Sequence, residues 1–512
     1  MRVTLIRTPS IFPRFQATIV QCPPLGLAYV AAAARAAGHE VTIVDAVGEA
    51  LDSSKWLDAR FRILGLTKEE IVERIDPAAE AIAVSCMFSQ DWPYVRELLA
   101  LVRARFPHAP IIAGGEAINA LPEFVLGESA VDHCVLGEGE ETFVELLDAL
   151  QADRPATEVP GLVTRDPATG APVHTPPRTR IGSPDQLPYP AWDLLPIESY
   201  LAQGKGFGVN RGRSMPIMAT RGCPYRCTFC SSPSMWTTRW VAREPVAVLD
   251  EIRFAIDRYQ AENFDFYDLT AIIKKQWIVQ FCNLVIQSGL KFTWQLPTGT
   301  RSEAIDEEVA ELLYESGCRN MTYAPESGSI DELTRIKKKV SLPNMRRSMR
   351  GCVVRGINVK TNIVLGFPGQ TRRDVYETMR FLVSLALLGV RDTMVSLFSP
   401  YPGSETYRQL VAEGKLPPPG DEYFYSLISY HNFASGRSWS DHVTGTELAI
   451  YRIVGMLVFY GVSFARRPVR LFELVSHIVT RRHESPLERG LVGFAQRAMG
   501  RNRMARGESR AT

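Results

Sequence analysis

The sequence of 512 residues has neither a long uncharged hydrophobic run nor a strong net charge. Its longest apolar stretch, 453–464, is shorter than the roughly 20 residues that a membrane-spanning helix needs, and Arg452 directly precedes it. Residues 1–6 have the pattern of a strand rather than that of a signal peptide. These absences predict a soluble, cytoplasmic protein.

The charges nearly cancel, with 58 Lys and Arg against 56 Asp and Glu. They are unevenly placed, because residues 465–512 contain eleven Arg, four Glu and no Lys. Such a basic segment indicates contact with an anionic surface, a nucleic acid or an anionic substrate, and its end, 500–512, has the composition of a solvated tail. We expect no nucleic-acid partner, whereas peripheral contact with a membrane is compatible with this segment.

Most of the nine cysteines are scattered, and we expect no disulfides in a chain of intracellular type. Three of them, Cys223, Cys227 and Cys230, stand at Cys-x3-Cys-x2-Cys spacing. A structural zinc site normally has four ligands, but the next cysteine, Cys282, lies 52 residues further on with no Cys or His close by. A redox Cys-x-x-Cys motif would leave Cys223 unused. A [4Fe-4S] cluster held by three thiolates, which leaves one iron open to a small molecule, explains all three.

The first 150 residues alternate strands and helices. The expected strands are 3–7, 40–45, 81–86, 110–114 and 132–136, and the expected helices include 25–37, 92–105 and 138–151. This order predicts a doubly wound parallel sheet of Rossmann-like α/β type over residues 1–151.

A long, partly structured linker is expected over 152–215, because ten of the fifty residues 151–200 are Pro. The alternation then resumes, with strands at 217–220, 264–268, 292–296, 320–324, 359–365 and 393–398. Helices are expected between them, for example at 246–260, 303–316 and 372–388. Six such units predict a partial (β/α)6 barrel over 216–400, with its chemistry at the carboxyl ends of the strands. Residues 401–512 should be mostly helical, with a helix from about Thr446 to Phe464.

The cysteine motif, with the aromatic Phe229 before its last cysteine, resembles the signature of the radical S-adenosylmethionine (SAM) superfamily. Later segments resemble that superfamily in the expected order, over about 216–404. The resemblance implies that SAM is contacted by Phe229, Asp268, Glu326, Ser327, Gly366 and Pro368. Many relatives carry two consecutive acids where this chain has Asp268 followed by Leu269. The implied chemistry is reductive cleavage of SAM to a 5′-deoxyadenosyl radical, with an electron donor such as flavodoxin or ferredoxin.

The N-terminal domain resembles the cobalamin-binding subgroup of these enzymes through PPLGLAY (23–29) and AGHEV (37–41). The resemblance implies cobalamin contacts at Leu25, Gly26, Ser85, Gly114, Gly115, Glu116, Gly137, Glu138, Gly139 and Glu140. Ala117 stands where many relatives have His, and no His has Asp two positions before it. Cobalamin would therefore bind without a protein histidine on cobalt.

Four functions remain open at this point. The first is a cobalamin-dependent radical methyltransferase acting on an unactivated carbon or a phosphinate centre of a small-molecule or lipid-like substrate. The second is non-methylating chemistry with the same cofactors, such as cyclisation, ring contraction or deoxygenation. The third, a radical methylthiotransferase, needs a second cluster, but Cys22, Cys86 and Cys134 are widely spaced and are expected to be buried. The fourth is a non-catalytic cobalamin or iron–sulfur sensor.

Aromatic side chains of the C-terminal region have two possible roles. Tyr451, Phe459, Tyr460 and Phe464 are expected to pack on the barrel rather than on a membrane. The others line a hydrophobic pocket or belong to the core, and they are Tyr423, Phe424, Tyr425, Tyr430 and Trp439.

Overall fold

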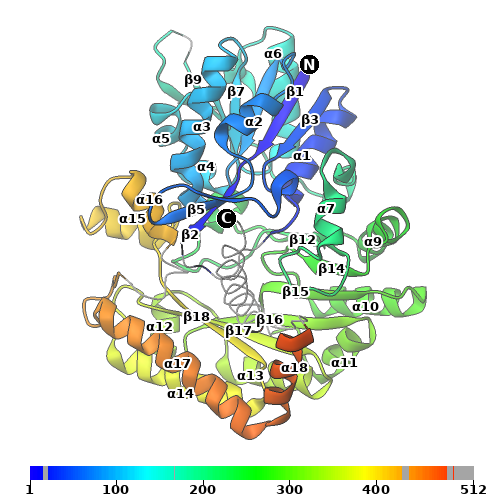
Figure 1. Cartoon of the computed structure of the whole chain (residues 1–512), viewed down its shortest axis with the longest axis vertical. Helices are drawn as coiled ribbons and strands as arrows, with labels where there is room; N and C mark the ends of the chain where they lie inside the picture. The colour runs from blue at the N-terminus through cyan, green and yellow to red at the C-terminus, as the bar shows by residue number, and fades with distance from the viewer. Residues whose placement is uncertain are drawn as a thin grey trace, which may run out of the picture.

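A computed structural model of the chain describes residues 1–14, 16, 21–166, 168–301, 303–428, 437–480 and 488. Figure 1 shows two α/β bodies, one stacked on the other. The N-terminal sheet forms the upper body and the barrel strands form the lower one. Of the C-terminal helices, Gly445–Arg466 and Val469–Thr480 lie along the lower body, whereas Asp421–Ser426 contacts the upper body.

The upper body is built on a seven-stranded sheet with the order β10-β9-β8-β7-β6-β1-β3. Its five parallel strands are β1 (Arg2–Arg7), β3 (Glu40–Asp45), β6 (Ala81–Ser85), β7 (Ile111–Gly114) and β8 (His133–Val135). Its helices are α1 (Leu25–Ala36), α2 (Lys68–Arg74), α3 (Trp92–Arg105), α4 (Glu116–Ala120), α5 (Pro122–Glu128) and α6 (Gly139–Gln151). The expected doubly wound, Rossmann-like sheet is thus confirmed.

The segment expected to be a linker is largely structured. Two antiparallel strands, β9 (Leu162–Arg165) and β10 (Pro172–His174), extend the sheet beyond β8. The short helix α7 (Ile197–Ala202) then lies against the carboxyl ends of β1 and β3, where the Tyr200 hydroxyl donates to Asp45 Oδ2 at 2.7 Å. Proline-rich composition was a poor guide here, because prolines are tolerated at sheet edges and in turns.

The sequence pattern did not predict a small antiparallel sheet beside the upper body. It consists of β2 (Ser10–Pro13), β4 (Ser54–Trp56) and β5 (Phe61–Leu64), in the order β2-β5-β4.

The lower body contains six parallel strands in sequence order, as expected for a partial barrel. They are β11 (Ser214–Ile217), β14 (Asn263–Phe266), β15 (Thr293–Thr300), β16 (Cys318–Glu326), β17 (Asn358–Leu365) and β18 (Asp392–Leu397). The helices between them include α9 (Pro245–Tyr259), α10 (Lys275–Ser288), α11 (Glu307–Glu315), α12 (Ile330–Arg335), α13 (Leu342–Val354) and α14 (Arg372–Leu388).

The sequence pattern predicted the first barrel strand at 217–220, three residues further along the chain than the observed β11. It ends at Ile217, and Thr220 begins β12 (Thr220–Arg221), which pairs antiparallel with β13 (Val241–Ala242). Thr220 and Arg221 therefore form a hairpin strand outside the barrel sheet, and the helix α8 (Ser232–Trp236) lies between the two hairpin strands in the chain.

The C-terminal region is helical, as expected, with α15 (Glu405–Ala412), α16 (Asp421–Ser426), α17 (Gly445–Arg466) and α18 (Val469–Thr480). Helix α17 begins one residue earlier than predicted, because Thr444 and Glu447 form the capping box. At 22 residues it is also longer than the apolar run, and within the described ranges it is the one helix long and apolar enough to cross a membrane. The predicted tail, 500–512, lies outside the described residues.

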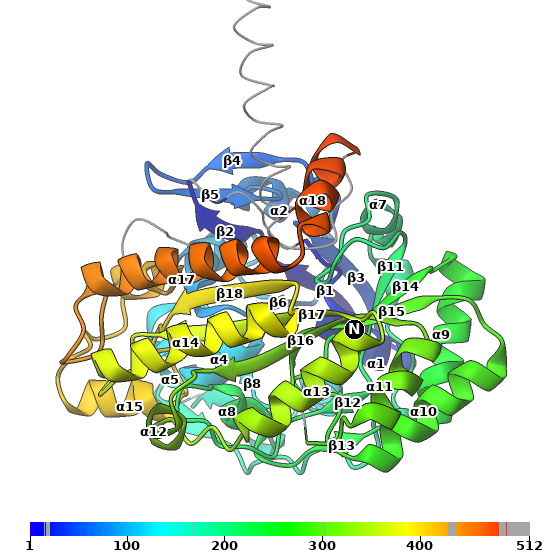
Figure 2. The same ribbon diagram turned by 90° about the horizontal axis from the view of Figure 1, so that it is seen from below.

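The packing of α17 confirms the expectation that its aromatic side chains face the barrel. It lies beside α14 and β18 (Figure 2), with Phe459 fully buried and the Tyr460 hydroxyl bonded to Asp392. Tyr423, Phe424 and Trp439 are also buried core residues, and Tyr425 stacks on Phe61. Tyr430 lies outside the described residues.

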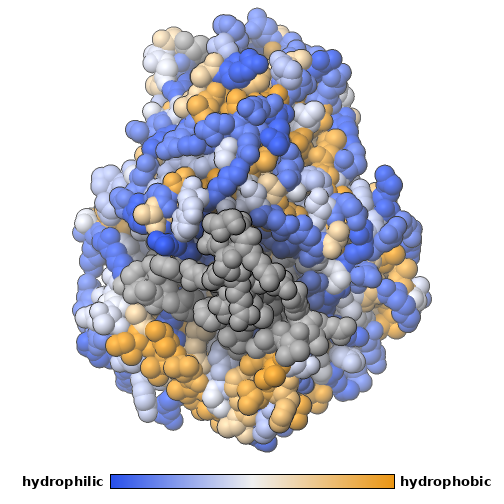
Figure 3. Space-filling model, in the orientation of Figure 1, coloured by the Kyte–Doolittle hydropathy of each residue, from blue (hydrophilic) through white to orange (hydrophobic). Residues whose placement is uncertain are grey.

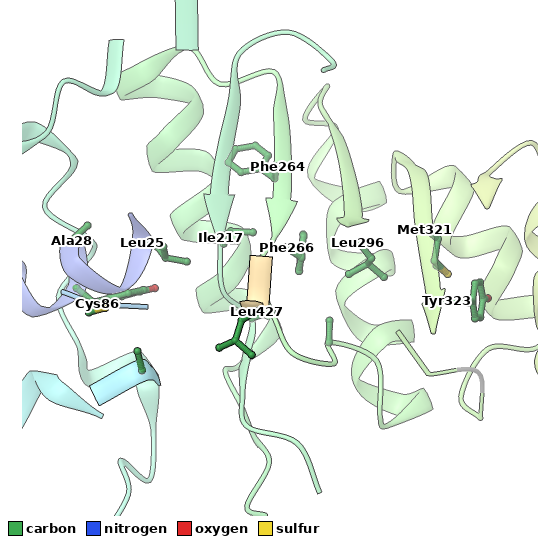
Figure 4. Close-up of a cluster of buried hydrophobic side chains, with 14 of the residues drawn as sticks. Leu25, Ala28, Cys86, Ile217, Phe264, Phe266, Leu296, Met321, Tyr323 and Leu427 are labelled. Atoms are coloured by element: carbon green, nitrogen blue, oxygen red, sulfur yellow. The ribbon is translucent and has the colours of Figure 1, made fainter. Parts of the chain in front are cut away.

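The two bodies share one hydrophobic core. Leu25, Ala28 and Cys86 from the upper body lie close to Ile217 and Phe266 of the barrel in Figure 4, and all belong to the same cluster of buried side chains. Because apolar burial is continuous across the boundary, the two bodies pack as one unit rather than as modules joined only by a tether.

Candidate functional site

The three motif cysteines lie on the segment between β12 and α8, which follows the carboxyl end of β11. Each of them is partly buried. Backbone hydrogen bonds fix the middle of the segment, since Thr228 N donates to Ile336 O at 3.0 Å and Thr406 N donates to Thr228 O at 2.9 Å. This cysteine loop (Gly222–Ser231) is therefore held by the ends of α12 and α15.

Two cations face the cysteine loop. Burial raises the pKa of the Cys223 and Cys227 thiols, whereas the charges of Lys338 and Arg301 oppose this rise. The Arg301 guanidinium lies 3.6 Å from the centre of the Tyr225 ring within the loop, and its side chain is buried. Positive charge beside Cys223 and Cys227 thus works against burial and towards their thiolates, which are the form that binds iron.

The donor set fits a cubane better than a single ion. Within the described parts of the chain, no three His, Cys, Asp or Glu side chains are placed to share one metal ion. The three thiols interact electrostatically with one another, so they lie near each other without converging on one point. A [4Fe-4S] cluster needs this arrangement, because each thiolate binds a different iron atom.

Asp268 holds the backbone that leads into the cysteine loop. It lies two residues beyond β14, and its carboxylate accepts hydrogen bonds from Thr220 Oγ1 at 2.6 Å and from the amides of Thr220 and Ala219. Burial raises its pKa to about 6, although these hydrogen bonds favour the ionised form. The structure thus gives Asp268 a positioning contact with the loop.

Glu326 ends β16 with a φ of 67°, a left-handed conformation that a residue other than glycine adopts only under constraint. Its carboxylate accepts from Lys338 Nζ at 2.8 Å, and both side chains are about nine-tenths buried. Phe229 lies next to this pair, with Lys338 Nζ 5.9 Å from its ring centre and the Phe367 ring 5.4 Å away. Three of the predicted SAM regions therefore meet beside the cysteine loop.

Ser327 and Gly366 are held by protein contacts. Ser327 is fully buried, and its hydroxyl bonds to Thr378 Oγ1 at 3.0 Å and accepts from Ser329 N at 3.1 Å. Gly366 has a φ of 91°, and its amide donates to Gln370 Oε1 at 2.6 Å. A Cβ at Gly366 would lie 2.8 Å from Leu448 of α17, so α17 packs directly on the turn that contains Gly366 and Pro368.

On the upper body, Ser85 and Gly114 end neighbouring strands, and the adjacent turn contains Gly115. A Cβ on Gly115 would lie 2.4 Å from Cys86 O, so this glycine is required by the protein backbone. A Cβ on Gly114 would meet nothing closer than 3.9 Å, which leaves room for a ligand. Leu25 is a core residue, whereas Gly26 is exposed on the first turn of α1.

Gly137 and Gly139 follow β8. Gly137 has a φ of 70°, and a Cβ there would have only Met235 O, at 3.8 Å, within contact distance. A Cβ on Gly139 would lie 3.3 Å from Val30, so this glycine allows α6 to pack closely against α1. Together with Gly114, Gly137 gives the carboxyl edge of β7 and β8 a backbone surface that a large ligand can approach.

The predicted acidic contacts of the upper body bind the lower body. Glu138 Oε1 accepts from Arg221 Nη1 at 3.1 Å, and Glu140 Oε1 accepts from Arg221 Nη2 at 2.6 Å. Arg180 Nε donates to Glu138 Oε2 at 3.1 Å, and all four side chains are less than 10% exposed. We call Glu138, Glu140, Arg180 and Arg221 the interdomain ion network.

Arg221 stands two residues before Cys223, so this network joins the cysteine loop to the turn at Gly137. Its guanidinium also lies 5.2 Å from the ring centre of Tyr29 in α1. A further bond links Ser231 Oγ, just after Cys230, to the Glu116 carboxylate. The side chains of Glu116, Glu138 and Glu140 thus contact the region around the cysteine loop, which leaves the glycine backbones as the free surface of that edge.

His174 ends the edge strand β10, where its ring bonds to Glu123 of α5 at 2.6 Å. The other three described histidines of the upper body lie away from the carboxyl edge of β7 and β8, since His39 precedes β3, His108 precedes β7 and His133 opens β8, all at the amino ends of parallel strands. This arrangement fits a cobalamin bound without a histidine ligand from these strands.

Cys86 and Cys134 are structural. They are fully buried, and their thiols donate to Phe88 O and Pro122 O. Burial raises the pKa of both thiols, which keeps them protonated and unsuited to binding a second cluster.

Sequence reasoning missed several residues of this site. Arg301 and Tyr225 stack beside the cysteines, and Arg180 and Arg221 join the two bodies, but single arginines carry no motif. Met87 and Phe88 follow β6 with 48% and 56% of their surface exposed, beside the turn at Gly114. Two large apolar residues directly after the strand predicted at 81–86 were the available signal in the sequence for a ligand contact.

A groove of the described surface lies elsewhere. It has a volume of about 920 Å³ and is lined by residues at the amino ends of β15 and β16, such as Thr293 and Gly317. This end of the barrel is opposite the cysteine loop, so the groove is not part of the candidate site.

Comparison with family models identifies both bodies. Residues 19–147 match the B12 binding domain, and residues 217–382 match the Radical SAM superfamily. The solved structure of the radical S-adenosylmethionine methyltransferase TsrM from Kitasatospora setae, with cobalamin and [4Fe-4S] cluster bound, has the same fold. It superposes with a TM-score of 0.63 at 18% identity, covering 80% of this chain and 75% of that chain.

Relatives of known or assigned activity fall into two groups. An uncharacterized methyltransferase of Pyrococcus horikoshii is 28% identical, with 81% of this chain and 84% of the relative covered. Cytidylyl-2-hydroxyethylphosphonate methyltransferase of Streptomyces wedmorensis is 27% identical over 79% of this chain and 80% of its own length. Anaerobic magnesium-protoporphyrin IX monomethyl ester cyclase of Rubrivivax gelatinosus is 24% identical over 76% of this chain and 66% of its own length.

The interdomain ion network predicts a large loss of stability when Arg221 is replaced by Met. This change leaves the buried Glu140 carboxylate without its cation, which typically costs about 3–5 kcal/mol. Arg355→Met is the matched control, because Arg355 also donates two hydrogen bonds to carboxylate oxygens, both of Glu311 and at 3.0 Å, but in a half-exposed pair. The control variant should lower the free energy of unfolding by at most about 1 kcal/mol. Equal shifts of the two variants in urea unfolding would contradict the assignment.

Proposed function

Because the chain belongs to the radical SAM enzymes that carry an N-terminal B12-binding domain, we propose that it is a methyltransferase. It transfers a methyl group from SAM to an unactivated carbon of a small-molecule or lipid-like substrate. The observation that supports this most directly is the junction of two sites, since the cysteine loop is bonded to the carboxyl edge of the B12-binding sheet. A cobalamin domain coupled to an open-iron cysteine motif suits an enzyme that uses both.

The residues of this chain have distinct roles in the proposal. Cys223, Cys227 and Cys230 hold the cluster, and the backbone at Gly114 and Gly137 carries cobalamin beside Met87 and Phe88. Lys338 and Arg301 offset negative charge of the thiolates and of the SAM carboxylate. When bound, the cluster supplies one-electron reduction and cobalamin supplies methyl-transfer chemistry. The shared apolar core and the protein contacts of the loop exclude water from the junction.

We further propose that the interdomain ion network sets the spacing of the two cofactor sites. Arg221 is two residues from Cys223, and its partner Glu138 is adjacent to Gly137. A buried, hydrogen-bonded charge network has few alternative geometries, so it fixes one relative position of the two loops. The domain boundaries at 151, 215 and 400, a cytoplasmic location and a flavodoxin- or ferredoxin-type electron donor are parts of the same proposal.

The cyclase relatives favour a second candidate, in which the same cofactors perform a radical transformation without methylation. A methylthiotransferase is less well supported, because Cys86 and Cys134 are buried and bonded to nearby carbonyls.

The first prediction concerns the cluster. Anaerobically reconstituted protein should contain about four irons and four sulfides per chain. Cys223→Ala, Cys227→Ala and Cys230→Ala should each abolish formation of 5′-deoxyadenosine, because each removes one of three thiolates. Cys282→Ala is the control, since Cys282 is a fully buried residue of α10 that contacts Ser316, and it should retain activity. Formation of 5′-deoxyadenosine by the Cys227 variant would refute the assignment.

The second prediction concerns cobalamin. One cobalamin should bind per chain, and the EPR spectrum of its cob(II) form should lack nitrogen splitting from a histidine. Gly114→Leu should weaken cobalamin binding at least about tenfold, because the new side chain occupies the open space beside β7. A tenfold loss corresponds to about 1.4 kcal/mol of binding free energy. Gly127→Leu is the control, because a Cβ at Gly127 has nothing within 4 Å on the surface helix α5. Nitrogen splitting from any histidine is the contrary result.

The third prediction concerns the reaction. With substrate present, two SAM molecules should be consumed per product, giving S-adenosylhomocysteine and 5′-deoxyadenosine in about equal amounts. Label from methyl-labelled SAM should enter the product, and omission of cobalamin should abolish methylated product while some 5′-deoxyadenosine still forms. Product without label and without S-adenosylhomocysteine would favour the non-methylating candidate and leave the cofactor assignments intact.

A further inference from the structure

The C-terminal helices α17 and α18 present a dense apolar face to solvent. The described surface has 24 exposed large hydrophobic residues, and nine of them fall between residues 450 and 475. They are Ile450, Ile453, Val454, Leu457, Val458, Val469, Leu471, Phe472 and Val475. Single exposed apolar residues are normal on a protein, but such a concentration marks an interaction surface. We call these nine residues the C-terminal apolar face.

The C-terminal apolar face is not the side of α17 that packs on the barrel. The opposite side of α17 is already buried, because Leu448, Gly455 and Phe459 pack inward, and a Cβ on Gly455 would lie only 3.0 Å from Met379 Sδ of α14. Leu457 is 66% exposed and Phe472 is 75% exposed, although both lie on well-formed helices. In Figure 3, apolar side chains gather over the lower part of the molecule, where Figure 1 places α17.

Helix α17 lies along the protein and does not leave it to cross a bilayer. Although it is long and apolar enough to span by composition, its buried side contains Arg452, which is 1% exposed. The Tyr460–Asp392 bond and the contact between Leu448 and Gly366 tie it to the barrel along most of its length. Only one side of the helix is therefore available to lipid, as in helices that lie in the membrane interface.

The surrounding charge is mostly basic, and the one acid between residues 450 and 475, Glu473, pairs with Arg391 at 3.2 Å. Arg466 and Arg467 are exposed at the turn between α17 and α18, and between Ile450 and Ala465 the only charged residue is the buried Arg452. After α18 the sequence continues with eight Arg and three Glu among residues 481–512. Basic residues beside an apolar helix face complement an anionic lipid surface.

The side-chain types also favour lipid over a protein partner. Eight of the nine residues are aliphatic, with Phe472 as the one aromatic residue. Protein interfaces are enriched in Tyr, Trp and Arg at their centres, whereas acyl chains need only apolar area. We propose that the C-terminal apolar face docks the enzyme peripherally on an anionic membrane, with α17 and α18 lying in the interface plane.

Flotation of the full-length protein with vesicles tests this proposal. One set of vesicles contains phosphatidylcholine alone, and the other contains equal parts of phosphatidylcholine and phosphatidylglycerol. The protein should float with the mixed vesicles and bind the neutral ones much more weakly. Leu457→Ser combined with Phe472→Ser should reduce binding at least about tenfold, because two large apolar side chains are lost. Arg466→Gln combined with Arg467→Gln should reduce binding to the mixed vesicles about fivefold per residue.

The control is Val246→Ser, which removes an apolar side chain of similar exposure, 53%, from α9 of the barrel. It should bind vesicles as the native protein does, and all variants should still produce 5′-deoxyadenosine from SAM. Absence of vesicle binding, or unchanged binding of the Leu457/Phe472 variant, would overturn the proposal. A dimer in solution that the same variant dissociates, without vesicle binding, would assign the face to a second copy. Equal binding to both vesicle types would refute the anionic requirement.

Discussion

The arrangement of the molecule depends on one buried arginine. Arg221 lies in the short hairpin before the cysteine loop, and its guanidinium contacts Tyr29, Glu138 and Glu140 of the other body. Because an isolated buried charge would cost several kcal/mol, these partners must stay in place whenever the two bodies are packed. The cysteine loop is thereby bonded to the turn that follows β8, and the Ser231–Glu116 bond repeats this link on the other side of the loop.

The need to hold the loops at this junction also explains why several residues contact protein rather than a ligand. Asp268, Ser327 and Gly115 all have contacts that fix the backbone around the junction. The surfaces left for cofactors are the thiols, the backbone at Gly114 and Gly137, and the groups near Lys338 and Phe229. A site that joins two large cofactors needs most of its polar residues to hold loops, because small shifts in position have large effects on reaction rates.

The regular parts of this fold could be predicted from sequence, whereas the junction could not. Helix 92–105 and strand 40–45 match the expected bounds, because hydrophobic periodicity and caps determine them locally. The cysteine spacing pointed to the cluster site, since it reflects covalent chemistry within one loop. The acidic partners of Arg221 are 81 or more residues away in the chain, and the Tyr225 ring that Arg301 contacts is 76 residues away, so no local pattern could identify these contacts. The antiparallel strands β9 and β10 were missed because proline-rich composition resembled a linker.

The central claim is that the interdomain ion network holds the two cofactor sites at one fixed separation. The most direct test is pulsed dipolar EPR on the reconstituted enzyme, which measures the distance between the cob(II)alamin spin and the reduced cluster. The structure predicts a single narrow distance distribution in the native protein, and a broadened one when Glu138 and Glu140 are both replaced by Gln. A broad or multiple distribution in the native protein, or an unchanged narrow one in the double variant, would contradict the account.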